Sequence, residues 1–359
     1  MTDGQPKDYH ALLAQGHAAY HALRLDEAVE RYQEALAARP DDYDALLGLA
    51  RTLTRRRDQE GARAYAERCV ALDPHRYEGH AALGALHFLT DDFDEAIAAL
   101  TEAVERAPAE PEPHLSLAQV YADLRRFEEA AAELDRGRDA LRAIANDAYR
   151  RQMEAFAFHV ETYVRLAEGK VAEARESAQE VIARAEDNPH AACLAYSNLG
   201  ILEARARRYD ASIEYLERAF AMNPYFHRAG AALGRILLVR NRNERAAEVL
   251  QQVLETAPSE NGSIRYAYAL ALGRLKRRDA AREQYHQALD QGLRGGERLM
   301  ARWQLIWQSR VGRQILVGIA LLAVLLWVVL GNPSPTTLTF LALLVLIVVL
   351  QRTIGRRRR

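Results

Sequence analysis

Apolar residues along most of this chain recur at spacings typical of amphipathic helices, and the pattern repeats every 34 residues. The segment "DDFDEAIAAL" at residues 91–100 is followed 34 residues later by "RRFEEAAAEL" at residues 125–134. In both segments, apolar side chains three and four positions apart would share one face of a helix. A fixed period of this length indicates a unit that stacks on copies of itself.

The repeat can be followed through eight frames, which begin at Tyr9, Tyr43, Tyr77, Pro111, Ala155, Cys193, His227 and, one residue late, Gly262. The eighth position of each frame is small: Gly16, Ala50, Gly84, Ala118, Thr162, Gly200, Gly234 and Ala269. The twentieth position is also small: Ala28, Ala62, Ala96, Ala130, Ala174, Ser212, Ala246 and Ala281. Small side chains at two matched positions let antiparallel helices approach closely, so each frame predicts one helix pair.

Two further positions support this interpretation. The twenty-fourth is mostly large and would fill the gap to the next helix: Tyr32, Leu100, Leu134, Leu216, Leu250 and Tyr285. The thirty-second is proline in five frames: Pro40, Pro74, Pro108, Pro224 and Pro258. Because proline cannot continue a helix, it would end the second helix of each pair.

These columns resemble the tetratricopeptide repeat (TPR) family, and the resemblance covers roughly residues 9–295. It implies an all-α, right-handed superhelical solenoid of about eight helix pairs. One pair cannot bury its own apolar face, so stacked neighbours share a continuous core. The resemblance also implies that partner proteins or peptides bind in a concave groove formed by the first helices.

The frame divides the chain into segments. A polar lead (residues 1–8) precedes units 1–4 (9–144), and units 5–8 follow at 155–295. Between them, residues 145–154 form an insert that we expect to lie in a lengthened helix. It is either a tolerated insertion, or a segment that bends the solenoid or carries a contact. A smaller insert occupies residues 189–192.

The resemblance assigns groove positions to the first helices. The residues there are His17, Tyr20, His21, Arg51, Arg55, Phe88, Gln119, Tyr163, Arg235 and Tyr266. Arg51 and Arg55 lie near aromatic residues, which favours a partner segment with an acidic residue beside an apolar one. A family variant clamps chaperone C-terminal carboxylates with Lys and Asn at two positions of its first unit. Leu13 and His17 stand there instead, which argues against that variant.

Three histidines of the first helix, His10, His17 and His21, would share one face. Three interpretations are open: an ordinary groove surface, a peptide-recognition element, or part of a metal site. The metal site is the least favoured, because no Cys or carboxylate on that face completes a set of ligands. The chain contains no P-loop, GxGxxG, HExxH or GxSxG motif. We therefore expect no enzyme activity and no cofactor.

The C-terminal region changes character. Residues 314–351 contain no charge and include two apolar runs, 315–330 and 338–350. They predict transmembrane helices at 314–331 and 338–351 with a turn at 332–337. The alternatives are a buried core hairpin and a re-entrant loop.

Charges around the apolar runs predict an orientation. Residues 296–313 form an amphipathic juxtamembrane segment with Trp303 and Trp307, and residues 352–359 form a basic C-terminus. Arginines flank the apolar runs on both sides, which places the solenoid and the C-terminus in the cytoplasm, at an inner or plasma membrane.

Charge and cysteine content narrow the range of possible functions. Nine of the 48 basic residues follow position 297. The body of the chain, residues 1–297, therefore has 39 basic residues and 49 acidic residues. An acidic body does not favour nucleic-acid binding. Cys69 and Cys193 are too isolated for a disulfide framework, and the polar N-terminus lacks a secretory signal. The Arg-rich, Lys-poor composition suggests a bacterial source.

Taken together, the patterns predict a membrane-tethered scaffold or assembly factor that binds partner proteins through a cytoplasmic groove. The alternatives are an accessory subunit of a membrane enzyme or transport complex and, less favoured, a metal-responsive sensor.

Overall fold

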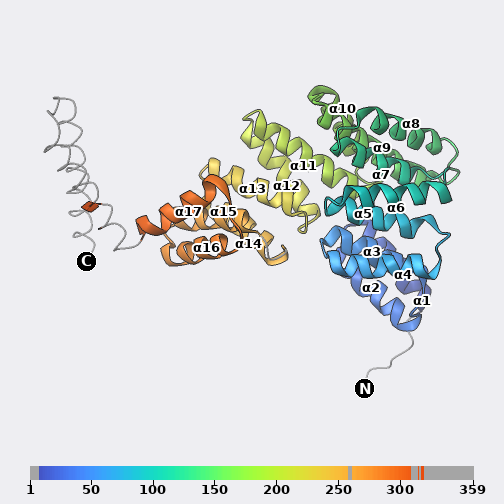
Figure 1. Ribbon diagram of the computed structural model, residues 1–359, viewed down its shortest axis with the longest axis horizontal. Coiled ribbons are helices and arrows are strands. Elements are labelled where there is room, and N and C mark those ends of the chain that lie inside the picture. Colours follow the sequence, from blue (N-terminus) through green and yellow to red (C-terminus); the bar gives the residue numbers. More distant parts are fainter. Residues whose placement is uncertain (1–7, 258–260, 309–313, 315–316, 319–359) are drawn as a thin grey trace, which may run out of the picture. The chain divides into compact units, whose positions relative to one another are not determined.

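A computed structural model describes residues 8–257 and 261–308, together with residues 314, 317 and 318. The described part contains seventeen α-helices and no strand, which confirms the all-α prediction (Figure 1). The chain divides into two compact units, Met1–Pro258 and Ser259–Arg359. Apart from those three residues, the predicted membrane helices lie outside the described residues. No helix within the described ranges has the length and apolar character needed to span a bilayer.

The first unit contains seven helix pairs that follow one another along the chain. Their first helices are α1 (Tyr9–His21), α3 (Tyr43–Arg56), α5 (Tyr77–Leu89), α7 (Pro111–Asp123), α9 (Asp147–Glu168), α11 (Pro189–Arg205) and α13 (His227–Val239). Their second helices are α2 (Leu25–Ala38), α4 (Gln59–Leu72), α6 (Phe93–Arg106), α8 (Phe127–Leu141), α10 (Val171–Ala183), α12 (Tyr209–Met222) and α14 (Asn243–Thr256). The second unit contains α15 (Gly262–Arg274), α16 (Arg278–Asp290) and α17 (Gly295–Gln308).

The small-residue columns lie where the two helices of a pair meet. A β-carbon on Gly84 of α5 would lie 2.5 Å from Cγ of Leu100 in α6, and one on Gly200 of α11 would lie 2.6 Å from Cγ of Leu216 in α12. Thus the eighth position receives the large twenty-fourth side chain. At the twentieth position, Ala96 has no exposed surface. This interlocking leaves no room for a larger side chain at either small position.

The turn inside a pair uses a left-handed residue in most units. Seven non-glycine residues have φ between 56° and 65°, namely Leu23, Arg57, Asp91, Arg125, Arg207, Asn241 and Lys276. Each stands between the first and second helix of its pair. This recurring turn gives successive pairs the same geometry, although left-handed φ is unfavourable for five of these residues; Asp91 and Asn241 tolerate it better.

The insert at residues 145–154 lengthens a first helix. α9 begins at Asp147, and the Asn146 side chain caps it by accepting a hydrogen bond from the Tyr149 backbone N–H at 3.0 Å. The added turns contact units on both sides. The Tyr149 hydroxyl donates to Glu110 at 3.1 Å, and Arg151 donates to Asp187 at 3.0 Å.

Within the first unit, the coil of helices closes on itself. The Tyr225 hydroxyl, in the turn before α13, donates to the Asp26 carboxylate at the start of α2 over 2.7 Å, across 199 residues of sequence. Arg56 forms an ion pair with Asp26 at 3.1 Å and lies 5.0 Å from the centre of the Tyr225 ring. We call these three residues the clasp.

Candidate functional site

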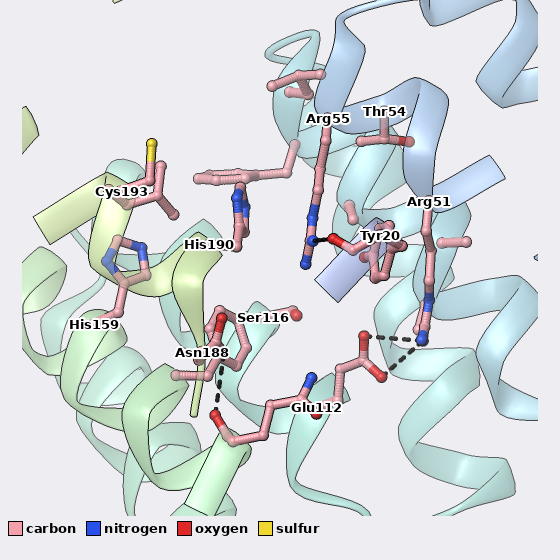
Figure 2. A pocket seen from close by; sticks show the side chains of 18 of the residues that line it. Tyr20, Arg51, Thr54, Arg55, Glu112, Ser116, His159, Asn188, His190 and Cys193 are labelled. Atoms are coloured by element: carbon pink, nitrogen blue, oxygen red, sulfur yellow. Dashed lines mark hydrogen bonds and ion pairs between the residues drawn. The ribbon is translucent and has the colours of Figure 1, made fainter. Parts of the chain in front are cut away.

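First helices of the first unit surround a partly enclosed pocket of about 520 Å³. Its walls come from α1, α3, α5, α7, α9 and α11, and from the segment around the start of α13 (Figure 2). Eight residues that we predicted for the groove line this pocket: His17, Tyr20, His21, Arg51, Arg55, Phe88, Gln119 and Tyr163.

The other two predicted groove residues lie elsewhere. Arg235 is exposed on α13 and does not line the pocket. Tyr266 belongs to α15 of the second unit, where its side chain is only 9% exposed and its ring centre lies 5.9 Å from that of Tyr285. Tyr266 is therefore part of a helix core.

The two carboxylates of the pocket wall are already paired. Arg51 donates to both oxygens of Glu112, at 2.8 and 3.0 Å, and each side chain is 26% exposed. Asp44 forms an ion pair with Arg76 at 3.1 Å. The sequence suggested that Arg51 and Arg55 together would meet an acidic partner. In the structure, Glu112 already pairs with Arg51, and the acidic partner stays a prediction.

Arg55 has a different environment. Its guanidinium carbon lies 3.8 Å from the centre of the Tyr20 ring, and it donates to the Tyr20 carbonyl at 3.2 Å. Arg57 and Arg228 also line the pocket. Burial lowers the pKa of Arg55 and of Arg57, and nearby Arg228 lowers that of Arg57 further. Within the described ranges, no carboxylate forms an ion pair with these three arginines.

Two histidines of the wall have unsatisfied ring nitrogens. His159 is 2% exposed; its Nε2 lies 3.1 Å from the Gln119 amide nitrogen, whereas its Nδ1 has no partner among the described residues. Nδ1 of His190 is likewise buried and unpartnered in that part of the chain. Burial lowers the pKa of His159 to about 4, and burial together with Arg55 lowers that of His190. Both rings are neutral at pH 7.

The three histidines of α1 have different surroundings. His17 is hydrogen-bonded through Nδ1 to the Tyr32 hydroxyl at 2.9 Å, and burial lowers the pKa of His17 and of His21. His10 is exposed and does not line the pocket. Across the residues with described positions, no group of three or more His, Cys, Asp or Glu is placed to hold a metal ion.

Aromatic side chains form another part of the wall. The Phe88 ring meets the Tyr163 ring edge-on at 6.2 Å, and the Tyr163 hydroxyl donates to Asp123 at 2.6 Å. Phe226, which directly follows the clasp residue Tyr225, also lines the pocket. The pocket therefore combines cationic and aromatic surface.

The cysteines are placed for packing. Cys193 contacts the pocket from α11, and its thiol donates to the Ala219 carbonyl at 3.3 Å. Burial raises the pKa of Cys193 and of Cys69 to about 12. Both thiols are therefore protonated at neutral pH and are poor nucleophiles.

Several pocket residues were not predicted. Glu112 and Arg228 occupy the second position of their frames, a groove position in the family pattern, but we did not name them as groove residues. Arg57, Asn188 and His190 lie at or just beyond helix ends, outside the positions that we carried over from the family pattern. The small insert at 189–192 was a usable signal for Asn188. This residue caps α11 by accepting from Ala191 N–H at 3.0 Å, and its amide donates to the Gln152 carbonyl at 3.1 Å (Figure 2).

In the second unit, α17 presents an exposed apolar face. One side packs inward through fully buried Ala301. The opposite side exposes five large apolar side chains, Leu299, Met300, Trp303, Ile306 and Trp307. The two indole rings stack with centres 6.3 Å apart. We call these five residues the α17 apolar face.

Two family models, both described as tetratricopeptide repeat, match the chain. One matches residues 87–150 and 204–272, and the other residues 13–77 and 163–224. The matches alternate along the chain and together cover more than half of it.

Individual proteins show more distant similarity. Hsp70-Hsp90 organizing protein 3 of Arabidopsis thaliana is 28% identical over 97 residues, which are 27% of this chain and 17% of that protein. A chain of the APC/C hetero-tetramer Cut9–Hcn1 matches with a TM-score of 0.58 at 15% identity, covering 84% of this chain and 56% of that one. A tetratricopeptide repeat protein from Parabacteroides merdae has a TM-score of 0.46 at 15% identity, covering 75% of this chain and 100% of that one. The match to the hetero-tetramer chain shows the fold alone.

Proposed function

Since this chain belongs to the tetratricopeptide repeat family, whose members mediate protein–protein interactions, we propose that it is a non-catalytic scaffold that binds an extended partner segment in the pocket. One observation carries the proposal. Side chains from six first helices, distributed over more than half of the chain, meet around one pocket of about 520 Å³. A pocket of that volume accommodates a few residues of a peptide.

We also propose that the scaffold is held at a membrane. The uncharged residues 314–351 supply two apolar segments that, with their uncharged flanks, come close to the lower limit of ~17 residues for spanning a bilayer. The α17 apolar face supports this proposal because it lies just before them and exposes Trp303 and Trp307 near Arg298 and Arg302. Tryptophan and arginine together favour the membrane–water interface. Tethering would raise the effective concentration of the pocket for membrane-bound partners.

Filling the pocket tests the binding proposal. Ala85 is an exposed residue of α5 that lines the pocket, so Ala85→Trp adds bulk there without entering the helix core. Ala98 of α6 is exposed but does not line the pocket, and Ala98→Trp is the matched control. Partners cross-linked to the full chain in membranes and identified by mass spectrometry should be lost with Ala85→Trp and kept with Ala98→Trp. Equal capture by both variants would place recognition outside the pocket.

A further inference from the structure

We propose that the pocket selects a segment with acidic side chains, which it holds among Arg55, Arg57 and Arg228. This inference rests on the proposed function and names the chemistry of its partner. The recognised groups are carboxylates of Asp or Glu within the segment, and apolar residues beside them contact the aromatic part of the wall.

The charges of the wall carry the inference. Its carboxylates, Asp44 and Glu112, are both neutralised by arginines of the protein, at 3.1 and 2.8 Å. Arg55, Arg57 and Arg228 remain without an ion pair in the part of the chain that the structure describes. Since arginine stays protonated at neutral pH, the pocket has an excess of positive charge although the body of the chain is acidic.

Uncompensated arginines in a partly enclosed pocket are unfavourable. Arg55 and Arg57 are half-buried, and Arg228 is close enough to Arg57 for their charges to repel. A carboxylate between these groups would relieve the repulsion and accept charge-assisted hydrogen bonds, which are stronger than those between neutral groups. Arginine also presents a planar pair of donors that matches a carboxylate.

Nearby carboxylates of the protein do not fill this role. Asp123 accepts the hydrogen bond of Tyr163 at 2.6 Å, and burial raises the pKa of this carboxyl group. Asp91 acts on the charge of Arg57 from a distance, and Asp123 and Arg228 act on each other in the same way, but neither carboxylate forms an ion pair with these arginines in the described structure. The three arginines therefore remain available to a ligand.

The unpartnered histidine nitrogens are a second, independent observation. Nδ1 of His159 and of His190 are buried, and no described residue satisfies them. Figure 2 shows His190 and Arg55 pointing into the same space. Buried polar atoms in folded proteins normally have a hydrogen-bond partner. A neutral imidazole with its proton on Nδ1 would donate to a carboxylate or peptide carbonyl of a bound segment.

The arginines of this site come from distant parts of the sequence. Arg57 directly follows α3. Arg228 lies in the first turn of α13, close behind the clasp residue Tyr225. The site exists because the coil closes. A carboxylate held between these arginines would bind the closed coil more tightly than an open one and would therefore stabilise it.

A fluorescein-labelled peptide, Glu-Glu-Phe-Glu-Glu-Leu with an amidated C-terminus, is a suitable probe for the full chain in zwitterionic nanodiscs. Fluorescence anisotropy gives its Kd, which is compared with that of the same peptide with glutamine in place of glutamate. We expect the glutamate peptide to bind about tenfold more tightly or better, with an advantage that shrinks as salt is added.

The matched variants are Arg55→Gln with Arg57→Gln, and Arg205→Gln with Arg207→Gln. The control pair has the same spacing at the end of α11, includes the same left-handed turn position and lies outside the pocket. The pocket pair should weaken glutamate-peptide binding about tenfold or more, and the control pair should leave it unchanged. Both double variants retain the basic C-terminus, so any binding of the peptide to that segment is the same in each. Arg228 is exposed, so Arg228→Gln should not disturb folding, and it should also weaken binding of the glutamate peptide.

The outcomes separate the inference from the proposed function. Equal binding of the glutamate and glutamine peptides, both lost with Ala85→Trp, would overturn acidic recognition but keep the pocket as a binding site. Absence of binding by the glutamate peptide, or equal loss with both arginine pairs, would also overturn it. A glutamine peptide with a free C-terminal carboxylate is a further comparison. If it bound more tightly than the amidated glutamate peptide, the pocket would recognise chain ends and not acidic side chains.

Discussion

His114 of α7 and Glu133 of α8 form a buried ion pair, with Nδ1 of the imidazole 2.6 Å from the carboxylate. The hydrogen bond to Glu133 raises the pKa of His114 above 6.5. Burial alone would raise the pKa of Glu133, but hydrogen bonding to His114 and the charges of His114 and Arg136 lower it below 4.5 overall. Both shifts mean that the folded state favours the charged forms of this pair.

The pair should make stability depend on pH. The raised pKa of His114 contributes stability that is complete below pH 6.5 and is lost as pH rises through the folded value. The lowered pKa of Glu133 contributes stability that is complete above pH 4.5 and is lost as pH falls through its folded value. The difference in urea midpoint between the parent and His114→Gln should therefore be largest at about pH 5.5 and smaller at about pH 9.

Exposed His75 provides the comparison, because it lies outside any buried ion pair in the described structure. His75→Gln should change the urea midpoint little, and by the same amount at both pH values. If His114→Gln also changed the urea midpoint by the same amount at both pH values, the charges of His114 and Glu133 would not contribute to stability.

Helix pairs are the elements on which this fold depends, and their close approach can be tested directly. Ala96 of α6 is fully buried, and its carbonyl oxygen would lie 3.4 Å from a β-carbon on Gly84 of α5. Ala96→Leu should destabilise the chain by about 1–3 kcal/mol, because overpacking forces the helices apart. Ala98→Leu on the exposed side of the same helix is the control and should leave the thermal midpoint nearly unchanged. Equal midpoints for both variants would contradict the assigned packing positions.

Helix starts could be predicted well where the repeat alone determines them. The frames beginning at Tyr43, Pro111 and His227 coincide with the starts of α3, α7 and α13. The repeat could not place the starts of α9 and α11, which begin eight and four residues before their frames. There the capping side chains, Asn146 and Asn188, lie inside or beside the inserts, and local capping rather than the repeat determines where the helix begins.

For the whole molecule, the main prediction is topological. In intact cells, Ser334→Cys should react with a membrane-impermeant maleimide, because residues 332–337 are predicted to lie outside the cytoplasm. Glu30→Cys, at an exposed position of α2, should react only after permeabilisation. Native Cys69 and Cys193 are fully buried and should contribute little background. The full chain should also resist carbonate extraction. Labelling at position 30 but not at 334 in intact cells would invert the orientation.

The pocket could be predicted in outline but not in its charge balance. Family positions identified Arg51 and Arg55 equally, and nothing local distinguishes them. Their difference arises because Glu112, 61 residues away, lies beside one and not the other. Arg228 likewise becomes a pocket residue only through the closure of the coil. Pairings over such separations depend on how successive units rotate, which the repeat pattern does not encode.

The clasp also has a consequence for folding. Contacts within and between neighbouring helix pairs are local in sequence, so the stack can grow rapidly from any unit. The Tyr225–Asp26 contact spans 199 residues, and its loop-closure entropy is offset only after the intervening pairs are ordered. We therefore expect the clasp to form last. During synthesis, the N-terminal pairs would be ordered before the segment around Tyr225 has left the ribosome, and a partner segment would meet the pocket before Phe226 and Arg228 complete its wall.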